Sequence, residues 1–186
     1  MQIARVAPSS PEIMHLKRSI VFISILMLCG MFFVAGTPAQ NKKTIILVRH
    51  AEKDVSAAAD PNDPVLTPEG RQRAERLWKA IKRFKPGALY STDYKRTRET
   101  LAEVSRRRRL EVRTYDPKKP DVLASEIMNS PTKRFLVVGH SNTIPGLVNL
   151  LIKKELFKQL DDAEHGVIWV VRLRKNKPPR TEILSY

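Results

Sequence analysis

Short apolar runs alternate along this chain with longer segments in which apolar residues recur every three or four positions. Residues 44–49 (TIILVR) form a nearly continuous apolar run, which is typical of a strand buried on both faces. After Thr67-Pro68-Glu69, apolar side chains follow the helical period as far as Phe84. Thr67 is a favourable N-cap and Pro68 suits the first helical position, so the pattern predicts a helix that ends at Pro86-Gly87.

The same alternation continues to the end of the chain. Further apolar and β-branched runs predict strands, and further helix-period segments, some preceded by capping residues, predict helices. Candidate caps are Ser91 to Asp93 for one helix, and Asn142 or Thr143 for another. The predicted strands are 88–92, 110–115, 134–139, 167–173 and 182–184, and the predicted helices are about 95–108, 122–128 and 144–152.

Strands that alternate with helices favour an α/β fold. Parallel strands need long crossover connections, and the helices that supply them cover the sheet. We therefore predict a three-layer sandwich in which a mostly parallel central sheet is flanked by helices on both faces, with right-handed crossovers.

The N-terminal segment differs from the rest of the chain. Residues 19–36 are almost wholly apolar, follow basic residues and precede small ones, which is typical of a secretory signal. The run is also long enough to span a bilayer uncleaved, and Lys42 and Lys43 flank it on the far side. We predict a signal peptide or membrane anchor in residues 1–39 and a single globular domain in residues 40–186. The protein is expected to be exported, to the periplasm or outside the cell. If the segment is retained as an anchor, residues 19–36 attach the protein to the membrane.

Net charge and cysteine content limit the kinds of ligand and of catalytic group that the globular part can use. The chain carries a net charge of +15, which favours anionic partners such as phosphorylated substrates, acidic envelope components or nucleic acid, unless it is simply a solvated basic surface. The only cysteine is Cys29, within the apolar segment, so the globular part has neither a disulfide nor a thiol nucleophile. No spacing of His, Cys and carboxylates resembles a metal site.

Polar residues that follow predicted strands are the candidates for a site, because ligands bind beyond the carboxyl ends of the strands in such sheets. The first strand ends in Arg49-His50, the second leads toward Arg96, and the strand at 134–139 is followed by His140. Each piece alone is weak evidence, since a single histidine beside an apolar run is usually structural. The convergence of two arginines and two histidines at one edge is the central inference.

Four motifs resemble those of the histidine phosphatase superfamily, in its phosphoglycerate mutase-like branch, and in size the chain is similar to the short phosphohistidine phosphatases. They are LVRHAEK (47–53), LTPEGRQRA (66–74), STDYKRTRET (91–100) and VVGHSNT (137–143), in the order found in the family. The arginine-histidine-glycine signature of the family appears here as Arg49-His50-Ala51, a departure that keeps a small residue.

The resemblance implies that His50 accepts the phosphoryl group and that Arg49, Arg96 and His140 bind it, without a cofactor. Neutral imidazole is a competent nucleophile near pH 7, and guanidinium groups bond phosphate oxygens in pairs. Catalysis of phosphoryl transfer depends chiefly on positioning the phosphoryl group and on placing positive charge around it.

The general acid for the leaving oxygen is less well defined. The family commonly uses a carboxylate from a loop that is short here. Asp116, which follows the third predicted strand, and Glu52 are the candidates, whereas Asp93 is a better candidate for a helix cap.

The leading hypothesis is hydrolysis of phosphomonoesters or phosphohistidine through a phosphohistidine on His50. The alternatives are a phosphoglycerate mutase-like phosphotransferase and a non-catalytic module that binds polyanions. The predicted partner is a phosphorylated small molecule or phosphoprotein, and no specific nucleic-acid recognition is expected. Small size points to phosphohistidine, whereas export points to phosphorylated envelope sugars or lipids, or scavenged esters.

Overall fold

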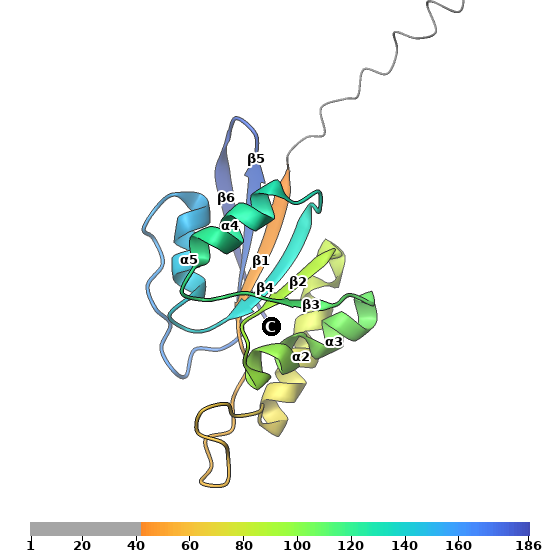
Figure 1. Cartoon of the computed structure of the whole chain (residues 1–186), viewed down its shortest axis with the longest axis vertical. Helices are drawn as coiled ribbons and strands as arrows, with labels where there is room; N and C mark the ends of the chain where they lie inside the picture. Colours follow the sequence, from red (N-terminus) through yellow and green to blue (C-terminus); the bar gives the residue numbers. More distant parts are fainter. Residues whose placement is uncertain (1–41) are drawn as a thin grey trace, which may run out of the picture. The chain divides into compact units, whose positions relative to one another are not determined.

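The central element of the structure, a computed structural model that describes residues 42–186, is a sheet of six strands in the order β3-β2-β4-β1-β5-β6 (Figure 1). The first four strands in this order, β3, β2, β4 and β1, pair in parallel, whereas β5 is antiparallel to both β1 and β6. Five of the six strands therefore point the same way. The strands are β1 (Lys43–Arg49), β2 (Ala88–Ser91), β3 (Val112–Thr114), β4 (Arg134–Gly139), β5 (Val167–Arg174) and β6 (Lys177–Ser185).

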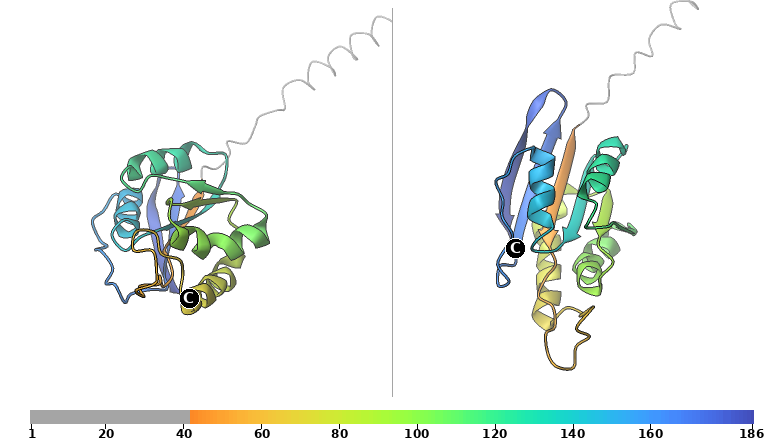
Figure 2. Two further views of the ribbon diagram at one scale, coloured as in Figure 1. Left: turned by 60° about the horizontal axis from the view of Figure 1, so that its bottom comes forward. Right: turned by 60° about the vertical axis from the view of Figure 1, so that its left-hand side comes forward.

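Helices cover both faces of this sheet. Helices α2 and α3 lie on one face of the sheet and α4 and α5 on the other (Figure 2), and their buried side chains belong to two separate core clusters. The helices are α2 (Pro68–Ile81), α3 (Lys95–Arg108), α4 (Pro120–Asn129) and α5 (Ile144–Ile152), and a 3₁₀ turn, η1 (Lys82–Phe84), follows α2. The predicted three-layer α/β sandwich is confirmed.

The alternation of side chains along β1 divides the core into two layers. Ile45 and Leu47 contact the α4–α5 layer, whereas Ile46 and Val48 contact the α2–α3 layer, and all four are fully buried. Successive side chains of a strand point to opposite faces, so a strand covered on both sides must be apolar at every position. This requirement explains the continuous run TIILV at the centre of the sheet.

Helix α2 begins as its sequence predicts. Thr67 is the N-cap, its hydroxyl accepts a hydrogen bond from the backbone N–H of Gly70 at 3.0 Å, and Pro68 occupies the first helical position. The prediction that a residue among 91–93 caps α3 is wrong. The backbone N–H of Lys95 donates instead to the carboxylate of Asp63 at 2.8 Å, and Asp93 pairs with the side chain of Arg98.

The predicted signal peptide or anchor, and the boundary after residue 39, fall outside the described residues. Among residues 42–186, no helix combines the length and the apolar character needed to cross a bilayer.

Candidate active site

The two candidate histidines leave the sheet from adjacent strands. Arg49, the last residue of β1, is in register with Gly139, the last residue of β4, and the backbone N–H of His50 donates to the carbonyl of Gly139 at 2.9 Å. The imidazoles of His50 and His140 consequently lie edge to face, with 5.5 Å between their centroids. Parallel pairing thus brings together two residues that are 90 positions apart in the sequence.

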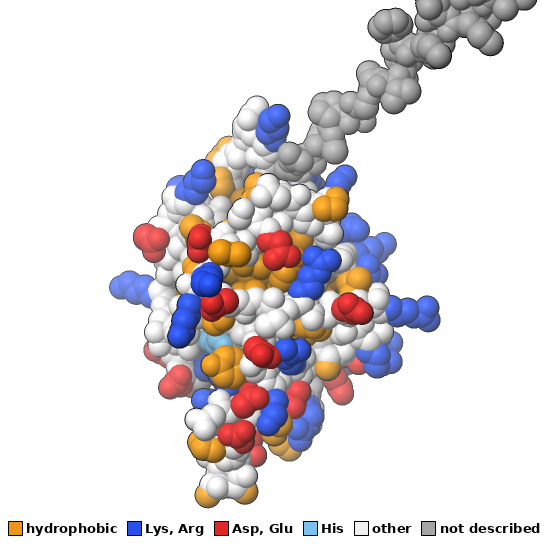
Figure 3. Space-filling model, in the orientation of Figure 1, with side chains coloured by type: hydrophobic (Ala, Val, Ile, Leu, Met, Phe, Trp, Pro, Cys, Tyr) orange, Lys and Arg blue, Asp and Glu red, His pale blue; other side chains and the backbone are white. Residues whose placement is uncertain are grey.

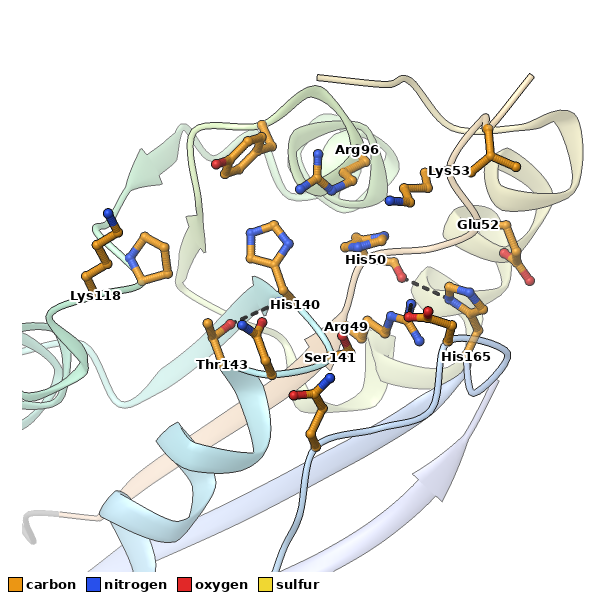
Figure 4. A pocket seen from close by; sticks show the side chains of 16 residues that line it. Arg49, His50, Glu52, Lys53, Arg96, Lys118, His140, Ser141, Thr143 and His165 are labelled. Carbon is orange, nitrogen blue, oxygen red and sulfur yellow. Dashed lines mark hydrogen bonds and ion pairs between the residues drawn. The ribbon is translucent and has the colours of Figure 1, made fainter. Parts of the chain in front are cut away.

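A cavity of about 800 Å³ opens at this edge of the sheet (Figure 4). Its lining includes Arg49, His50, Arg96 and His140, the four residues that the sequence predicts would meet. They come from the ends of β1 and β4 and from the first turn of α3. The predicted convergence therefore exists in the structure.

The tautomer of His50 is set by the backbone carbonyl of the next residue, Ala51. Its Nδ1 lies 2.7 Å from the carbonyl oxygen of Ala51, which can only accept, so Nδ1 carries the proton and Nε2 keeps its lone pair. The ring is buried, and burial lowers its pKa to about 3; the charges of Arg96 and Arg49 act in the same direction, while the bond to Ala51 opposes them. At neutral pH this histidine is a neutral ring with a free nucleophilic nitrogen.

His140 is held by two buried threonines. Its Nε2 lies 2.9 Å from the hydroxyl of Thr92, which in turn lies 3.0 Å from the hydroxyl of Thr97. Burial and the charges of Arg96 and Arg49 lower the pKa of His140 to about 4. Thr97 donates to the backbone carbonyls of Thr92 and Tyr94, so its oxygen accepts from the Thr92 hydroxyl. The Thr92 oxygen in turn accepts from Nε2–H of His140, which leaves Nδ1 of the neutral ring unprotonated.

Arg49 is anchored by a loop that is distant in the sequence. One terminal nitrogen donates to the carbonyl oxygens of Asp161 and Glu164, at 2.7 and 3.0 Å. The Nε–H group is buried and has no hydrogen-bond partner in the described part of the chain. A guanidinium that is fixed on one side and unsatisfied on the other has a donor available for an anion.

Arg96 has a similar character. Its guanidinium stacks on the ring of Tyr94 at 4.2 Å, and its Nε–H is also buried without a partner among residues 42–186. The backbone carbonyl of Arg96 accepts from the hydroxyl of Thr100, whose oxygen accepts from the N–H of Ala51. Helix α3 and the segment after β1 are thereby fixed to each other.

Ala51 does not face the cavity. Its side chain is fully buried in a small cluster with Leu66 of the following segment and Ala74 of α2. The replacement of glycine by alanine in the family signature is accommodated by this apolar contact, away from the lining residues.

The structure does not bring Asp116 to the cavity. Its side chain is exposed and accepts from the N–H of Lys118, while Pro117 and Lys118 line the rim. Strand β3, which precedes it, is an edge strand three places from β1, which corresponds to about 14 Å at the usual strand spacing. The sequence could indicate that Asp116 follows the carboxyl end of a strand, but it could not show that this strand lies at the edge of the sheet.

Glu52 lines the cavity but is engaged in an ion pair. One carboxylate oxygen accepts from Nε of Arg73 at 2.7 Å, and both side chains are mostly buried. Burial raises the pKa of Glu52, but the hydrogen bond and charge of Arg73 outweigh it, and the pKa lies below its ordinary value. Such a carboxylate stays ionised at neutral pH.

Several lining residues were not singled out by the sequence. They include Lys53, Tyr94, Lys118, Asp162 and His165. Nδ1 of His165 lies 3.2 Å from the backbone carbonyl of His50. The position of Lys53 within the LVRHAEK motif was the one signal that could have drawn attention to it. Among the described residues, including those of the cavity, no three His, Cys, Asp or Glu side chains are grouped so as to hold a metal ion.

Comparison with known proteins gives a family match. Residues 45–117 match the histidine phosphatase superfamily (branch 1), a range that contains Arg49, His50 and Arg96 and ends before His140. The resemblance inferred from the four motifs is confirmed. No curated protein sequence matches the chain.

Solved structures of low sequence identity share the fold. A mycobacterial glucosyl-3-phosphoglycerate phosphatase aligns with a TM-score of 0.61 and 13% identity, over 77% of this chain and 99% of its own. The protein histidine phosphatase SixA, in complex with tungstate, aligns with a TM-score of 0.61 and 18% identity, over 76% of this chain and 96% of its own. At these identities the likeness shows the fold alone.

Proposed function

Because residues 45–117 belong to the histidine phosphatase superfamily, we propose that this chain is a phosphatase that carries phosphate on His50. The proposed substrates are phosphomonoesters or phosphohistidine. The observation that carries the proposal is the pair of buried, unpartnered guanidinium Nε–H groups of Arg49 and Arg96, at a cavity that also contains two neutral imidazoles.

In the first step, Nε2 of His50 attacks phosphorus while the bond to the leaving group breaks. Nε2 is the nitrogen with the lone pair, and the low pKa of His50 keeps it unprotonated at neutral pH. Arg49 and Arg96 bond the phosphoryl oxygens, over which charge is spread in the transition state. Nδ1 of His140 is the ring nitrogen that points toward His50 in Figure 4, and it donates to a phosphoryl oxygen once the charge of the bound group has favoured protonation of the ring.

In the second step, water attacks the phosphorus of phosphohistidine. The bond between phosphorus and Nε2 breaks, inorganic phosphate forms, and His50 returns to its neutral state. The same four side chains serve both steps, because the transferred group stays in place while the leaving group is exchanged for water.

The test is hydrolysis of p-nitrophenyl phosphate by the purified protein, with His50→Ala as the matched inactive variant. We expect turnover by the wild type, and a phosphorylated enzyme that is stable in alkali and labile in acid, as phosphohistidine is. Equal turnover by both proteins would contradict the role of His50. Phosphate binding without turnover would instead support the polyanion-binding alternative. On the face drawn in Figure 3, Lys and Arg side chains are spread among Asp and Glu rather than gathered into one patch, which gives that alternative little support.

Export is a second part of the proposal, motivated by the apolar segment at residues 19–36. Fractionation of cells that produce the full chain, with determination of its N-terminus, tests it. A protein that begins near residue 40 in the exported fraction supports a cleaved signal, and a full-length protein in the membrane fraction supports an anchor. Full-length protein in the cytosol contradicts both.

A further inference from the structure

The proposed reaction needs a proton donor for the leaving oxygen, and the carboxylates of the cavity are poorly suited to this task. Glu52 is paired with Arg73, and the side chain of Asp162 is fully exposed at the rim, 3.7 Å from Arg49. Apart from these two, no Asp or Glu side chain of the described chain lines the cavity. The donor is therefore to be sought among the other protic groups.

Lys53 is presented to the cavity by a rigid segment. Residues 52–54 pair with residues 65–67, through an isolated antiparallel bridge between Lys53 and Leu66. The N–H of Thr67 donates to the carbonyl of Glu52 at 2.9 Å, and the N–H of Asp54 donates to the carbonyl of Val65 at 2.8 Å. These two hydrogen bonds, one on each side of the bridge, fix the direction in which the Lys53 side chain leaves the backbone.

Alternation along this extended segment separates Glu52 from Lys53. Successive side chains of an extended chain point to opposite sides, so when Glu52 turns toward Arg73 on α2, Lys53 must turn the other way. Helix α2 also packs closely here: a side chain at Gly70 would collide with the backbone carbonyl of Glu52. The ion pair and the close contact thus turn Glu52 toward α2 and direct Lys53 away from that helix.

The ammonium group of Lys53 faces the reacting centre. In Figure 4 its side chain extends toward the space between His50 and Arg96. Its charge is one of the causes that lower the pKa of His140, after burial and the charges of Arg96 and Arg49. In the described part of the chain, no Asp or Glu lies within ion-pair distance of Lys53. The ammonium group keeps all three of its protons available for a ligand.

His165 is a weaker candidate. Its Nδ1 is directed at the backbone carbonyl of His50, and the charges that act on its ring are those of Arg49, Glu52 and Arg73. Burial lowers the pKa of His165, and its Nδ1 proton is directed at that carbonyl, so the neutral ring has no second proton to give to a leaving group.

We propose that Lys53 is the catalytic acid and base that the carboxylates do not supply, an inference that rests on the proposed function. As Nε2 of His50 bonds to phosphorus and the bond between phosphorus and the ester oxygen breaks, the ammonium of Lys53 transfers a proton to that oxygen, and an alcohol leaves. The neutral amine then takes a proton from the attacking water as the bond between phosphorus and Nε2 breaks. Inorganic phosphate is released, and Lys53 and His50 return to their starting states.

The proton balance suits alkyl esters in particular. An alkylammonium ion is a far stronger acid than an aliphatic alcohol, so proton transfer from it to a developing alkoxide is favourable. A nitrophenolate leaves as a stable anion and needs no proton. Proton donation therefore predicts a dependence on the leaving group that a purely phosphate-binding lysine would not produce.

The experiment compares kcat for p-nitrophenyl phosphate and glycerol 2-phosphate in the wild-type protein, Lys53→Met and Lys53→Arg. We expect Lys53→Met to lower turnover of the alkyl ester about 100-fold, with a loss at least tenfold smaller for the aryl ester. Lys53→Arg keeps the charge but cannot give up a proton, so it should restore little of the alkyl ester activity. Lys118→Met, at the rim of the same cavity, should change both substrates by the same factor.

The outcomes separate the inference from the proposed function. If Lys53→Met loses the same factor on both esters, or loses nothing, Lys53 is not the proton donor. Full rescue of alkyl ester turnover by Lys53→Arg would show that charge alone is needed, and would also overturn the inference. A wild-type protein that hydrolyses neither ester contradicts the proposed function, and the inference with it.

Discussion

Lowering the pH from 7 to 5 should destabilise the folded protein through the two neutral imidazoles of its cavity. His50 and His140 have pKa values of about 3 and about 4 in the folded state, because burial disfavours their charged forms and the nearby guanidiniums add to the effect. In the unfolded chain each ring recovers an ordinary pKa of about 6.5. Between pH 6.5 and these lower values, the unfolded state binds protons that the folded state does not, so stability falls as pH falls.

The magnitude follows from the two pKa values. For His50, protonation of the unfolded chain between pH 7 and pH 5 removes about 2 kcal/mol from the free energy of unfolding. His140 contributes in the same direction but somewhat less than its pKa alone suggests, since part of its ring is accessible to solvent. Together they represent a large fraction of the 5–15 kcal/mol by which domains of this size are typically stable.

Urea unfolding at pH 7 and pH 5 measures this change, and His50→Gln supplies the comparison. All other titrating groups are shared, so the difference in pH dependence between wild type and variant isolates His50. We expect the variant to lose about 2 kcal/mol less than the wild type over this interval. NMR signals of the two rings should also show no titration between pH 8 and pH 5. Equal pH dependence of the two proteins, or a ring that titrates near pH 6.5, would refute the assignment of buried neutral imidazoles.

Three further predictions concern the proposed catalysis. Arg49→Lys and Arg96→Lys keep the charge but lose the paired geometry, and each should lower kcat/KM for p-nitrophenyl phosphate about 10- to 100-fold; near-wild-type values would show that charge alone suffices. Thr92→Val removes the hydroxyl that fixes the tautomer of His140 and should lower kcat/KM about tenfold, with Thr92→Ser restoring it; an active valine variant would contradict this positioning role. Dialysis against EDTA should leave the rate unchanged, and a loss that a divalent ion restores would argue against a reaction carried by side chains alone.

The sequence predicts the fold well where burial determines the structure. Strand β1 is covered on both faces, and its apolar run gives its position to within one residue. Strand β6 is the opposite case: only its end was predicted, as 182–184, but it extends over Lys177–Ser185. Most of its side chains are exposed, and prolines occur in it, as edge strands allow, so backbone pairing with β5 maintains it rather than burial. A pattern of apolar residues cannot reveal such a strand.

For the site, the sequence predicts which side chains meet but not what holds them. The carboxyl ends of β1 and β4 bring His50 and His140 together through local pairing, which follows from the fold class. The anchoring of Arg49 by the carbonyls of Asp161 and Glu164 depends on the path of a loop and has no local signature. The carboxylate of Asp63, which accepts from the first N–H of α3, is likewise a long-range contact. Neither contact can be deduced before the chain is folded.

Burial of these polar and charged groups is costly for the stability of the folded protein. A buried donor without a partner costs about 1–3 kcal/mol, and more when it is charged, and both Arg49 and Arg96 contain one. The cavity adds two imidazoles that burial keeps uncharged, beside guanidiniums that would repel a proton on either ring. Replacement of these groups by apolar residues would suit a purely structural role better. Under the proposed function, a tetrahedral dianion would compensate the charges of Arg49 and Arg96, favour a proton on Nδ1 of His140 and leave Nε2 of His50 free to attack, so these groups suit a preformed phosphoryl site.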